Sequence, residues 1–324
     1  MTVRSLLSIL ADGKFHSGSE LGESLGISRS AIWKHIRRLE EAGIEIYSVK
    51  GRGYRIPGGL DLLDLEEVRS HLKSGVEKQL GPLSLELISS STNEIAMKAC
   101  QKGDCHGSLY MAEQQTAGRG RRGREWVSPF ARNLYFSLVW RFEQGVGALE
   151  GLSLLVGLSL VKALENLGVQ GVKVKWPNDL LVADKKLAGI LVEVNGEASG
   201  QCQVVIGVGL NVDMPALADE SIDQPWVDLA TITDTRLSRN SVLAEVLNEL
   251  TFGLNRFSDQ GFAPMIDEWQ SYNTHQDQDV VLHMGNGMVT GVCKGVDPSG
   301  ALILETEKGM ELFFGGEVSL RSAP

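Results

Sequence analysis

A loop rich in glycine and arginine carries the strongest chemical signal in this sequence of 324 residues. It runs from Gly118 to Arg124 and reads GRGRRGR. Glycines let backbone amides approach an anion closely, and arginines supply forked donors that match phosphate or carboxylate. The loop fits neither the GxxxxGK[ST] phosphate loop nor a GxGxxG turn between strand and helix. It therefore predicts a nucleotide site built on neither of these folds, with a basic surface loop or an RNA-binding patch as the alternative.

Three further segments bring polar side chains to the ends of predicted strands. Lys175 to Asp179, which reads KWPND, combines a lysine, an aromatic ring and a carboxylate. Lys186 follows seven residues after Asp179, and Gly207 to Asn211, GVGLN, ends a strand with two glycines and an amide. Each segment alone is more often a turn, a cap or a solvated charge. Together they predict one shared ligand pocket, because binding sites combine a few convergent polar groups in a concave surface.

These segments lie in a region of strands and helices from residue 83 to about residue 273. Expected strands are 83–88, 110–113, 133–140, 173–175, 179–182, 186–194 and 204–210, and expected helices are 94–101, 149–167, 241–257 and 262–270. Runs of strands with a few helices against them predict an α+β domain with a mixed sheet. After residue 279, short strands at 280–283, 289–296, 301–305 and 310–314 alternate with glycine-containing turns. We therefore expect a multidomain α+β protein with a central domain at 65–273 and a small β-domain at 274–324.

Residues 1–60 predict a separate DNA-binding module. Residues 19–40 read as a short helix, a glycine turn and a longer helix capped by Ser28, which is the helix–turn–helix layout. Two short strands around a basic tip at 50–53 follow, and together these elements predict a winged helix. A module used for protein contacts is the alternative. The residues expected to contact DNA are Ser30, Trp33, Lys34 and Arg37 on the longer helix and Lys50 and Arg52 in the wing.

Charge and cysteine usage set the broad class of the protein. The chain carries a net charge of −10, but residues 1–60 hold nine basic and six acidic residues, which favours nucleic-acid binding by this part alone. The four cysteines form no CxxC pair and no metal-ligand cluster is apparent, so we predict reduced thiols, no protein metal site and a cytoplasmic location. The apolar run 148–164 is interrupted by Glu150 and Lys162 and predicts no membrane span.

The order of the motifs resembles that of biotin–protein ligases. With the winged-helix head, the chain resembles the bifunctional bacterial form that also represses the biotin operon. The resemblance covers nearly the whole chain and implies a catalytic domain similar to class II synthetases, followed by a small SH3-like barrel. The motifs that carry it are Ser91-Thr92-Asn93, Gln115 to Gly123, Lys175 to Asp179, Lys186 to Ile190 and Gly207 to Asn211.

The resemblance implies a reaction in two steps. Biotin and ATP form biotinoyl-AMP and pyrophosphate, and a lysine of a biotin carboxyl carrier protein then attacks the adenylate. Fixed cations and Mg²⁺ must offset the repulsion between carboxylate and triphosphate. Implied catalytic residues are Lys186, Arg121 and Asp179, the last as candidate base for the transfer, with a Mg²⁺ or water contact as the alternative. Implied biotin contacts are Ser91, Thr92, Asn93, Gln115, Arg119, Gly120, Arg121 and Lys186, and implied nucleotide contacts are Arg119, Arg121, Trp126, Lys186 and Asn211.

The resemblance also implies operator DNA of biotin genes as a partner. Because one winged helix contacts one half-site, we expect a homodimer on DNA. Strand Gly189–Val194 is apolar, and we expect it to be an exposed sheet edge that forms the dimer surface, while loop Thr116–Val127 acts as a lid. Two alternatives are a lipoate-type ligase with a vestigial head and a ligand-sensing repressor without catalysis. The joint presence of Lys186, Asp179 and the arginine loop counts against the second alternative.

Overall fold

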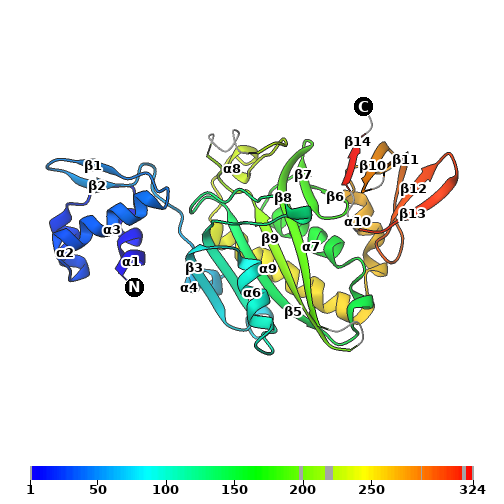
Figure 1. Cartoon of the computed structure of the whole chain (residues 1–324), viewed down its shortest axis with the longest axis horizontal. Helices are drawn as coiled ribbons and strands as arrows, with labels where there is room; N and C mark the ends of the chain where they lie inside the picture. The colour runs from blue at the N-terminus through cyan, green and yellow to red at the C-terminus, as the bar shows by residue number, and fades with distance from the viewer. Residues whose placement is uncertain (1, 197–199, 216–221, 286, 316–318, 323–324) are drawn as a thin grey trace.

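The chain forms three units in sequence order, which follow one another along the longest axis of the molecule (Figure 1). The computed structural model describes residues 2–196, 200–215, 222–285, 287–315 and 319–322. A small helical unit with a hairpin lies at one end, a large mixed sheet with helices lies in the middle, and a small antiparallel sheet lies at the other end. This arrangement confirms the predicted multidomain α+β fold.

The N-terminal unit is a winged helix, as the sequence predicts. A reciprocal capping box begins its second helix, because the Ser17 hydroxyl accepts a hydrogen bond from Glu20 N and the Glu20 carboxylate accepts one from Ser17 N. That helix ends at Gly26 in the left-handed conformation, with φ of 65°. Ser28 caps the next helix through Ala31 N. The elements are α1 (Thr2–Leu10), α2 (Gly18–Leu25), α3 (Arg29–Glu41), β1 (Tyr47–Val49) and β2 (Gly53–Arg55).

The central sheet has seven strands in the order β3-β4-β5-β9-β8-β7-β6. Only β3 and β4 are parallel, and the remaining pairs are antiparallel, which confirms the expected mixed sheet. The strands are β3 (Leu83–Ser89), β4 (Leu109–Gln115), β5 (Leu134–Phe142), β6 (Lys173–Lys175), β7 (Asp179–Val182), β8 (Lys185–Gly196) and β9 (Cys202–Leu210).

Strand β8 lies between β7 and β9 in the sheet, so the prediction of an exposed edge at Gly189–Val194 is wrong at Gly189, which pairs with β7, and at Ile190, whose amide donates to the carbonyl of Asn178. Residues 185–189 pair with β7, and the whole strand pairs with β9. Alternating apolar residues show that the faces of a strand are buried, but they carry no information about its hydrogen-bonding edges. Pairing with β7 stops at Gly189, so residues 191–196 have no second strand beside them within the described ranges.

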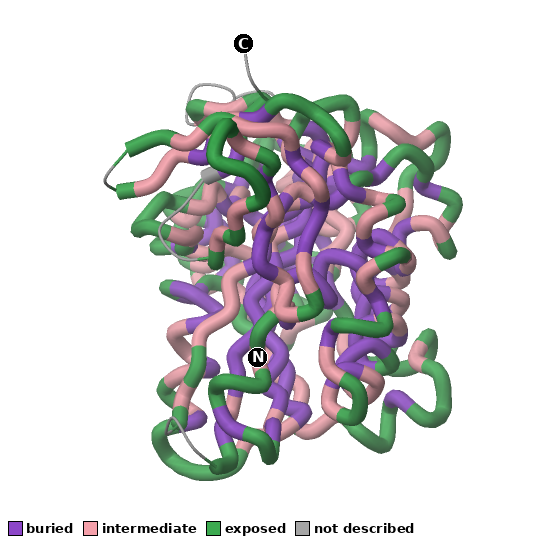
Figure 2. The backbone as a smooth tube through the Cα atoms, turned by 90° about the vertical axis from the view of Figure 1, so that its right-hand side faces the viewer, coloured by how far each residue is buried: buried purple, intermediate pink, exposed green. Residues whose placement is uncertain are grey.

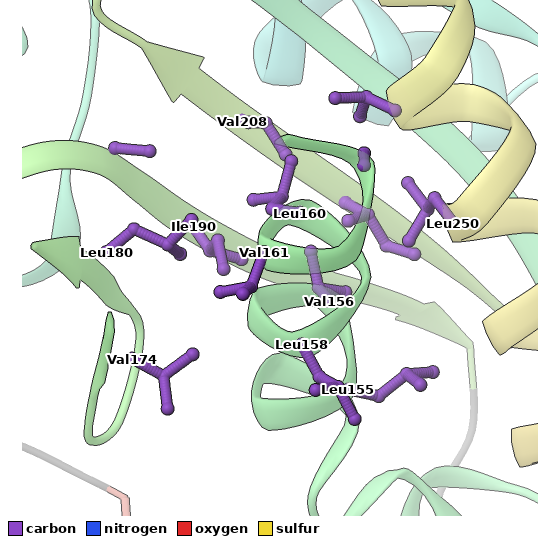
Figure 3. Close-up of a cluster of buried hydrophobic side chains, with 14 of the residues drawn as sticks. Leu155, Val156, Leu158, Leu160, Val161, Val174, Leu180, Ile190, Val208 and Leu250 are labelled. Carbon is purple, nitrogen blue, oxygen red and sulfur yellow. The ribbon is translucent and has the colours of Figure 1, made fainter. Parts of the chain in front are cut away.

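Helix α7 (Leu152–Asn166) forms the core of the central unit between the sheet and helix α9 (Arg239–Gln260) (Figure 3). Its apolar side chains meet residues of β6, β7, β8 and β9, including Val174 and Ile190, and Leu250 of α9. The segment Val146–Asn166 is long and apolar enough to cross a membrane by length and composition. Leu155, Val156 and most other apolar side chains of α7 are nevertheless buried in this core. Figure 2 shows the same distribution, with buried backbone inside and exposed loops outside.

Several short elements fall outside the sequence predictions because they are too short to show a helical period. They are α4 (Leu65–Ser70), α5 (Ser74–Glu77) and α8 (Leu229–Ile232). The predicted helix at 94–101 begins two residues earlier, as α6 (Thr92–Cys100), and the predicted helix at 262–270 overlaps α10 (Ile266–Tyr272), which extends two residues further.

The C-terminal unit is a sheet of five antiparallel strands in the order β13-β12-β11-β10-β14. The indole of Trp176 connects it to the KWPND segment by donating a hydrogen bond to the carbonyl of Gly300 at 3.0 Å. The strands expected from the sequence do not include β14, which returns toward the central unit. The strands are β10 (Asp279–Met284), β11 (Gly287–Val296), β12 (Leu302–Thr306), β13 (Gly309–Phe313) and β14 (Ser319–Ser322).

Candidate active site and DNA-binding surface

A single cavity of about 720 Å³ brings together the predicted ligand-binding segments. The arginine loop, the N-terminus of α6, the KWPND turn and strands β8 and β9 line it, and β14 of the C-terminal unit contributes to one side. The shared pocket predicted from three separate segments is therefore present, and the arginine loop lines it as well. Every residue predicted to be catalytic or to bind biotin or nucleotide lines it: Ser91, Thr92, Asn93, Gln115, Arg119, Gly120, Arg121, Trp126, Asp179, Lys186 and Asn211.

The N-terminus of α6 presents a set of buried polar groups to one end of the cavity. Gln115 Oε1 accepts a hydrogen bond from the backbone amide of Thr92 at 2.9 Å. Asn93 Nδ2 donates to Glu193 Oε2 at 2.8 Å and to the carbonyl of Leu191 at 3.2 Å. A side chain on Gly207 would overlap the Asn93 amide, so this glycine of the GVGLN motif leaves the space that the Asn93 side chain occupies. These contacts fix the donors and acceptors that a ring with several polar atoms would meet.

Lys186 and Asp179 form an ion pair inside the cavity, with 2.9 Å between Nζ and Oδ1. Their side chains are only 16% and 19% exposed, so solvent screens this pair less than a surface pair. Lys175 lies nearby on β6, and its burial lowers the pKa of its ammonium group while Asp179 opposes that effect. The cavity thus holds two amino groups around one carboxylate, an arrangement that can receive an anion.

Two facing glycines of β8 and β9 form a flat shelf for the ring of Trp126. Gly189 and Gly209 are register partners in the sheet. A Cβ atom on Gly189 would lie 2.9 Å from the indole, and one on Gly209 would overlap it. Lys186 Nζ lies 5.4 Å from the centroid of the same ring. Gly189 and Gly209 therefore leave the space that the ring of Trp126 occupies beside Lys186.

The arginine loop folds back on itself and is attached to the sheet by two arginines. Trp126 N donates to the carbonyl of Gly118 at 2.9 Å, which closes the base of the loop. Arg119 forms an ion pair with Glu193 at 3.2 Å, and Arg121 donates to Asn178 Oδ1 at 3.1 Å. Burial lowers the pKa of Arg121. The loop thus covers the cavity through contacts that a bound anion could replace.

Asn211 differs from the other predicted site residues because its side chain serves the protein backbone. It is buried, and Nδ2 donates to the carbonyls of Lys186 at 3.3 Å and Val227 at 3.1 Å. Four cationic residues not among the predicted site residues also line the cavity: Arg122, Arg124, Lys175 and Arg321. Lys175 belongs to the KWPND motif identified in the sequence. No sequence motif indicates that Arg321 belongs to this site, because only folding brings β14 to it.

The outward face of α3 and the wing form a second candidate site. Ser30, Trp33, Lys34 and Arg37 are exposed on α3, and Lys50 and Arg52 are exposed in the wing. The guanidinium group of Arg52 lies 4.2 Å from the ring centroid of Phe15. Lys34, Arg37, Lys50 and Arg52 form no ion pair within the described part of the chain. The surface is therefore free to meet a polyanion.

Three family models match successive parts of the chain. An HTH domain matches residues 2–55, the biotin/lipoate A/B protein ligase family matches residues 85–211, and the biotin protein ligase C terminal domain matches residues 275–321. The matches fall on the winged helix, on the sheet that carries the cavity, and on the C-terminal sheet. They agree with the three units of the fold.

Two curated relatives and one solved structure extend this agreement to the full length. The chain is 42% identical to the bifunctional ligase/repressor BirA of Salmonella typhimurium and 40% identical to that of Escherichia coli, over 98% of this chain and 97% of each relative. A biotin protein ligase from Aquifex aeolicus, solved in complex with biotin and ATP, is 30% identical and superposes with a TM-score of 0.66, covering 75% of this chain and all of the other. The chain therefore belongs to the family of bifunctional biotin–protein ligases and repressors.

Proposed function

We propose that this protein activates biotin with ATP to biotinoyl-AMP and transfers biotin to a lysine of a biotin carboxyl carrier protein, the acceptor of acetyl-CoA carboxylase. In its adenylate-bound form it represses biotin biosynthesis genes by binding their operator DNA. The observation that carries this proposal is the Lys186–Asp179 pair beneath the arginine loop, in a chain that matches bifunctional ligase/repressors over 98% of its length.

In the first step the protein must bring two anions together. We assign Lys186 to the biotin carboxylate and the α-phosphate, and Arg119 and Arg121 to the phosphates and the intermediate. Each cation has a partner it can exchange for substrate: Asp179, Glu193 or Asn178. Preorganised donors of this kind stabilise charge that develops in the transition state. The polar groups of Ser91, Thr92, Asn93 and Gln115 are assigned to the biotin ring, and Trp126 and Asn211 to the nucleotide side.

Magnesium enters with ATP as part of the substrate. The described residues contain no group of three or more His, Cys, Asp or Glu side chains that could hold a metal ion on their own. Mg²⁺ is commonly held by one or two carboxylates together with substrate phosphates. Asp179 is the carboxylate that fits this role best, because it lies in the cavity beside Lys186.

In the second step the carrier lysine needs a proton acceptor. Asp179 is our candidate, because Lys186 leaves it when the ammonium group turns to the substrate. The lid, Thr116 to Val127, must exclude water until the acceptor arrives, since the mixed anhydride would otherwise hydrolyse. Arg121 is the natural anchor of the lid, because its contact with Asn178 crosses the cavity to the KWPND turn.

We further propose that the repressor is a cytoplasmic homodimer on DNA. The side of β8 at residues 191–196 that faces away from β9 is the expected pairing surface, because no strand covers it in the described part of the chain. A ligand that orders the lid lowers the cost of ordering nearby loops on dimerisation. Sedimentation with and without biotin plus ATP tests this, and equal dimer affinity in both conditions would remove the switch.

Exchange of labelled pyrophosphate into ATP tests the enzymatic proposal. We expect exchange that requires biotin and is not supported by lipoate. Exchange with lipoate alone would instead indicate a lipoate-type ligase. Absence of exchange together with ligand-dependent DNA binding would indicate a sensing repressor without catalysis.

A further inference from the structure

Trp33 is an exposed aromatic residue on the face of α3 that is proposed to enter the major groove. Its side chain is 51% exposed, and it lies among Ser30, Lys34 and Arg37, which are also exposed. The core of the winged helix is complete without it, because Ile32, Ile36 and Leu39 of the same helix form the inner face. Packing of the head therefore gives no reason for an indole at this position.

The ring of Trp33 is held in place by its neighbour one turn along the helix. The guanidinium carbon of Arg37 lies 5.2 Å from the ring centroid, within the range of a cation–π contact. Residues four apart lie on the same face of a helix, so this stack forms within α3 itself. The indole thus presents an apolar face with one polar edge, and its contact with Arg37 exists before any partner arrives.

The chemistry of the major groove restricts what such a surface can recognise. Base edges in this groove are hydrogen-bond donors and acceptors, and the C5-methyl group of thymine is the one apolar group among them. Phosphates attract the positive charges of lysine and arginine, but contact with a phosphate does not stabilise the apolar face of an indole. An apolar ring on the recognition helix is therefore matched by thymine methyl groups, while Lys34 and the wing meet the backbone.

We propose that Trp33 is a specificity-determining residue that reads thymine methyl groups in each operator half-site, with Arg37 as the residue that positions its ring. This inference rests on the proposed binding of operator DNA by the winged helix. It adds the base type that one side chain selects, and it names the apolar contact as the source of that selection.

The test uses the full chain with biotin and ATP and a library of random DNA duplexes. Duplexes enriched by binding define the preferred site, and each thymine in that site is then replaced by 2′-deoxyuridine, which removes only the methyl group. We expect uracil at one or two positions in each half-site to weaken binding about fourfold, the effect of one buried methyl group. Trp33→Ala should bind the thymine and uracil duplexes equally, and Trp33→Phe should retain part of the difference.

Lys34→Ala is the matched control, since it removes an exposed charge from the same helix face. It should weaken all duplexes and preserve the ratio between thymine and uracil. Equal binding of both duplexes by the unchanged protein, or an unchanged ratio in Trp33→Ala, would overturn the inference while DNA binding itself stands. Failure of the unchanged protein to enrich or bind any duplex would contradict the proposed DNA-binding function as well.

Discussion

The two candidate sites of this molecule both depend on cations, but they hold them in opposite ways. In the cavity, Lys186 faces Asp179 at 2.9 Å and Arg119 faces Glu193 at 3.2 Å. On the winged helix, Arg37 and Arg52 are exposed and stack on aromatic rings without any carboxylate partner among the described residues. The cavity pairs these two cations with carboxylates, and the winged helix keeps its two arginines available.

This difference fits the two classes of ligand. A cation in a cavity costs less to hold when a carboxylate faces it than when it is unpaired, and a bound anion must replace the internal carboxylate or amide, which adds selectivity. An unpaired exposed cation attracts any polyanion, and its effect is screened by salt. The stacked aromatic ring restricts the position of the guanidinium group without neutralising its charge. The cavity is therefore suited to a small, specific anion and the winged helix to the DNA backbone.

A buried ion pair lies next to the segment that connects the winged helix to the central unit. Arg239 and Glu113 are 1% exposed and 2.6 Å apart. Arg239 also donates to the carbonyl of Asn133 at 2.9 Å and to that of Asp61, just after the winged helix. Asn133 Oδ1 in turn accepts a hydrogen bond from Val212 N, the residue after Asn211. These contacts attach the segment that leaves the head to the strand ends that line the cavity.

The largest effect is expected at this junction. Arg239→Met should lower the free energy of unfolding of the central unit by about 3–5 kcal/mol, because it leaves the Glu113 carboxylate buried without its partner. Urea denaturation followed by tryptophan fluorescence measures the change. Arg236→Met is the matched control, since Arg236 is 55% exposed and its pair with Asp213 should contribute about 1 kcal/mol or less. Equal losses in both variants would show that burial of the pair is unimportant.

The second effect concerns the paired cations of the cavity. Lys186→Ala should bind biotin but form biotinoyl-AMP about 10²–10³-fold more slowly, because the ammonium group acts on charge that develops in the transition state. Single-turnover assays with ATP and biotin measure the rate. Lys185→Ala removes the same charge from the neighbouring exposed residue and should leave the rate near normal. Near-normal adenylation in Lys186→Ala would refute the catalytic assignment.

A third, smaller effect concerns retention of the intermediate. Arg121→Gly removes the contact of the lid with Asn178 and should release biotinoyl-AMP about tenfold faster, in line with loss of one charged hydrogen bond. Labelling of bystander lysines by the released adenylate reports this leak. Arg122→Gly removes a charge from the same loop at a residue whose φ of 60° suits glycine. Labelling confined to the carrier in both variants would contradict the lid assignment.

The sequence predicted the three units and the membership of the cavity, because each depends on local signals. Helix caps, glycine turns and strand-end motifs are readable without knowing the fold, and residues far apart in sequence then met in one pocket. The resemblance supplied the roles of Lys186 and Arg121, which spacing alone left open. Strand pairing could not be predicted from local signals: β8 pairs with β7 as far as Gly189, and Arg321 reaches the cavity only because β14 returns to it. The short helices α4 and α5 were also missed, since propensity is weak over so few residues.

The next, weaker effect concerns the exposed cations of the winged helix that have no carboxylate partner among the described residues. Arg52→Ala should weaken binding to every DNA sequence and lower the slope of log K against log salt by about one, the value for one phosphate contact. Titrations at several salt concentrations measure the slope. Arg69→Ala is the control, because Arg69 is half-exposed on α4 and already paired with Glu66. An unchanged slope in Arg52→Ala would place Arg52 away from the phosphates.

The smallest effect isolates the aromatic support from the charge. Phe15→Leu keeps Arg52 but removes the ring that lies 4.2 Å from its guanidinium group, and Arg55 loses the same ring at 5.1 Å. A cation–π contact at an exposed site contributes about 0.5–1 kcal/mol, so DNA affinity should fall by about two- to fivefold. The salt slope should stay unchanged, since no positive charge is lost. Phe15→Tyr retains the ring and should bind like the original protein. A reduced slope in Phe15→Leu would mean that the ring determines whether Arg52 reaches a phosphate at all, whereas an unchanged affinity would show that the wing arginines need no support from the helical part of the head.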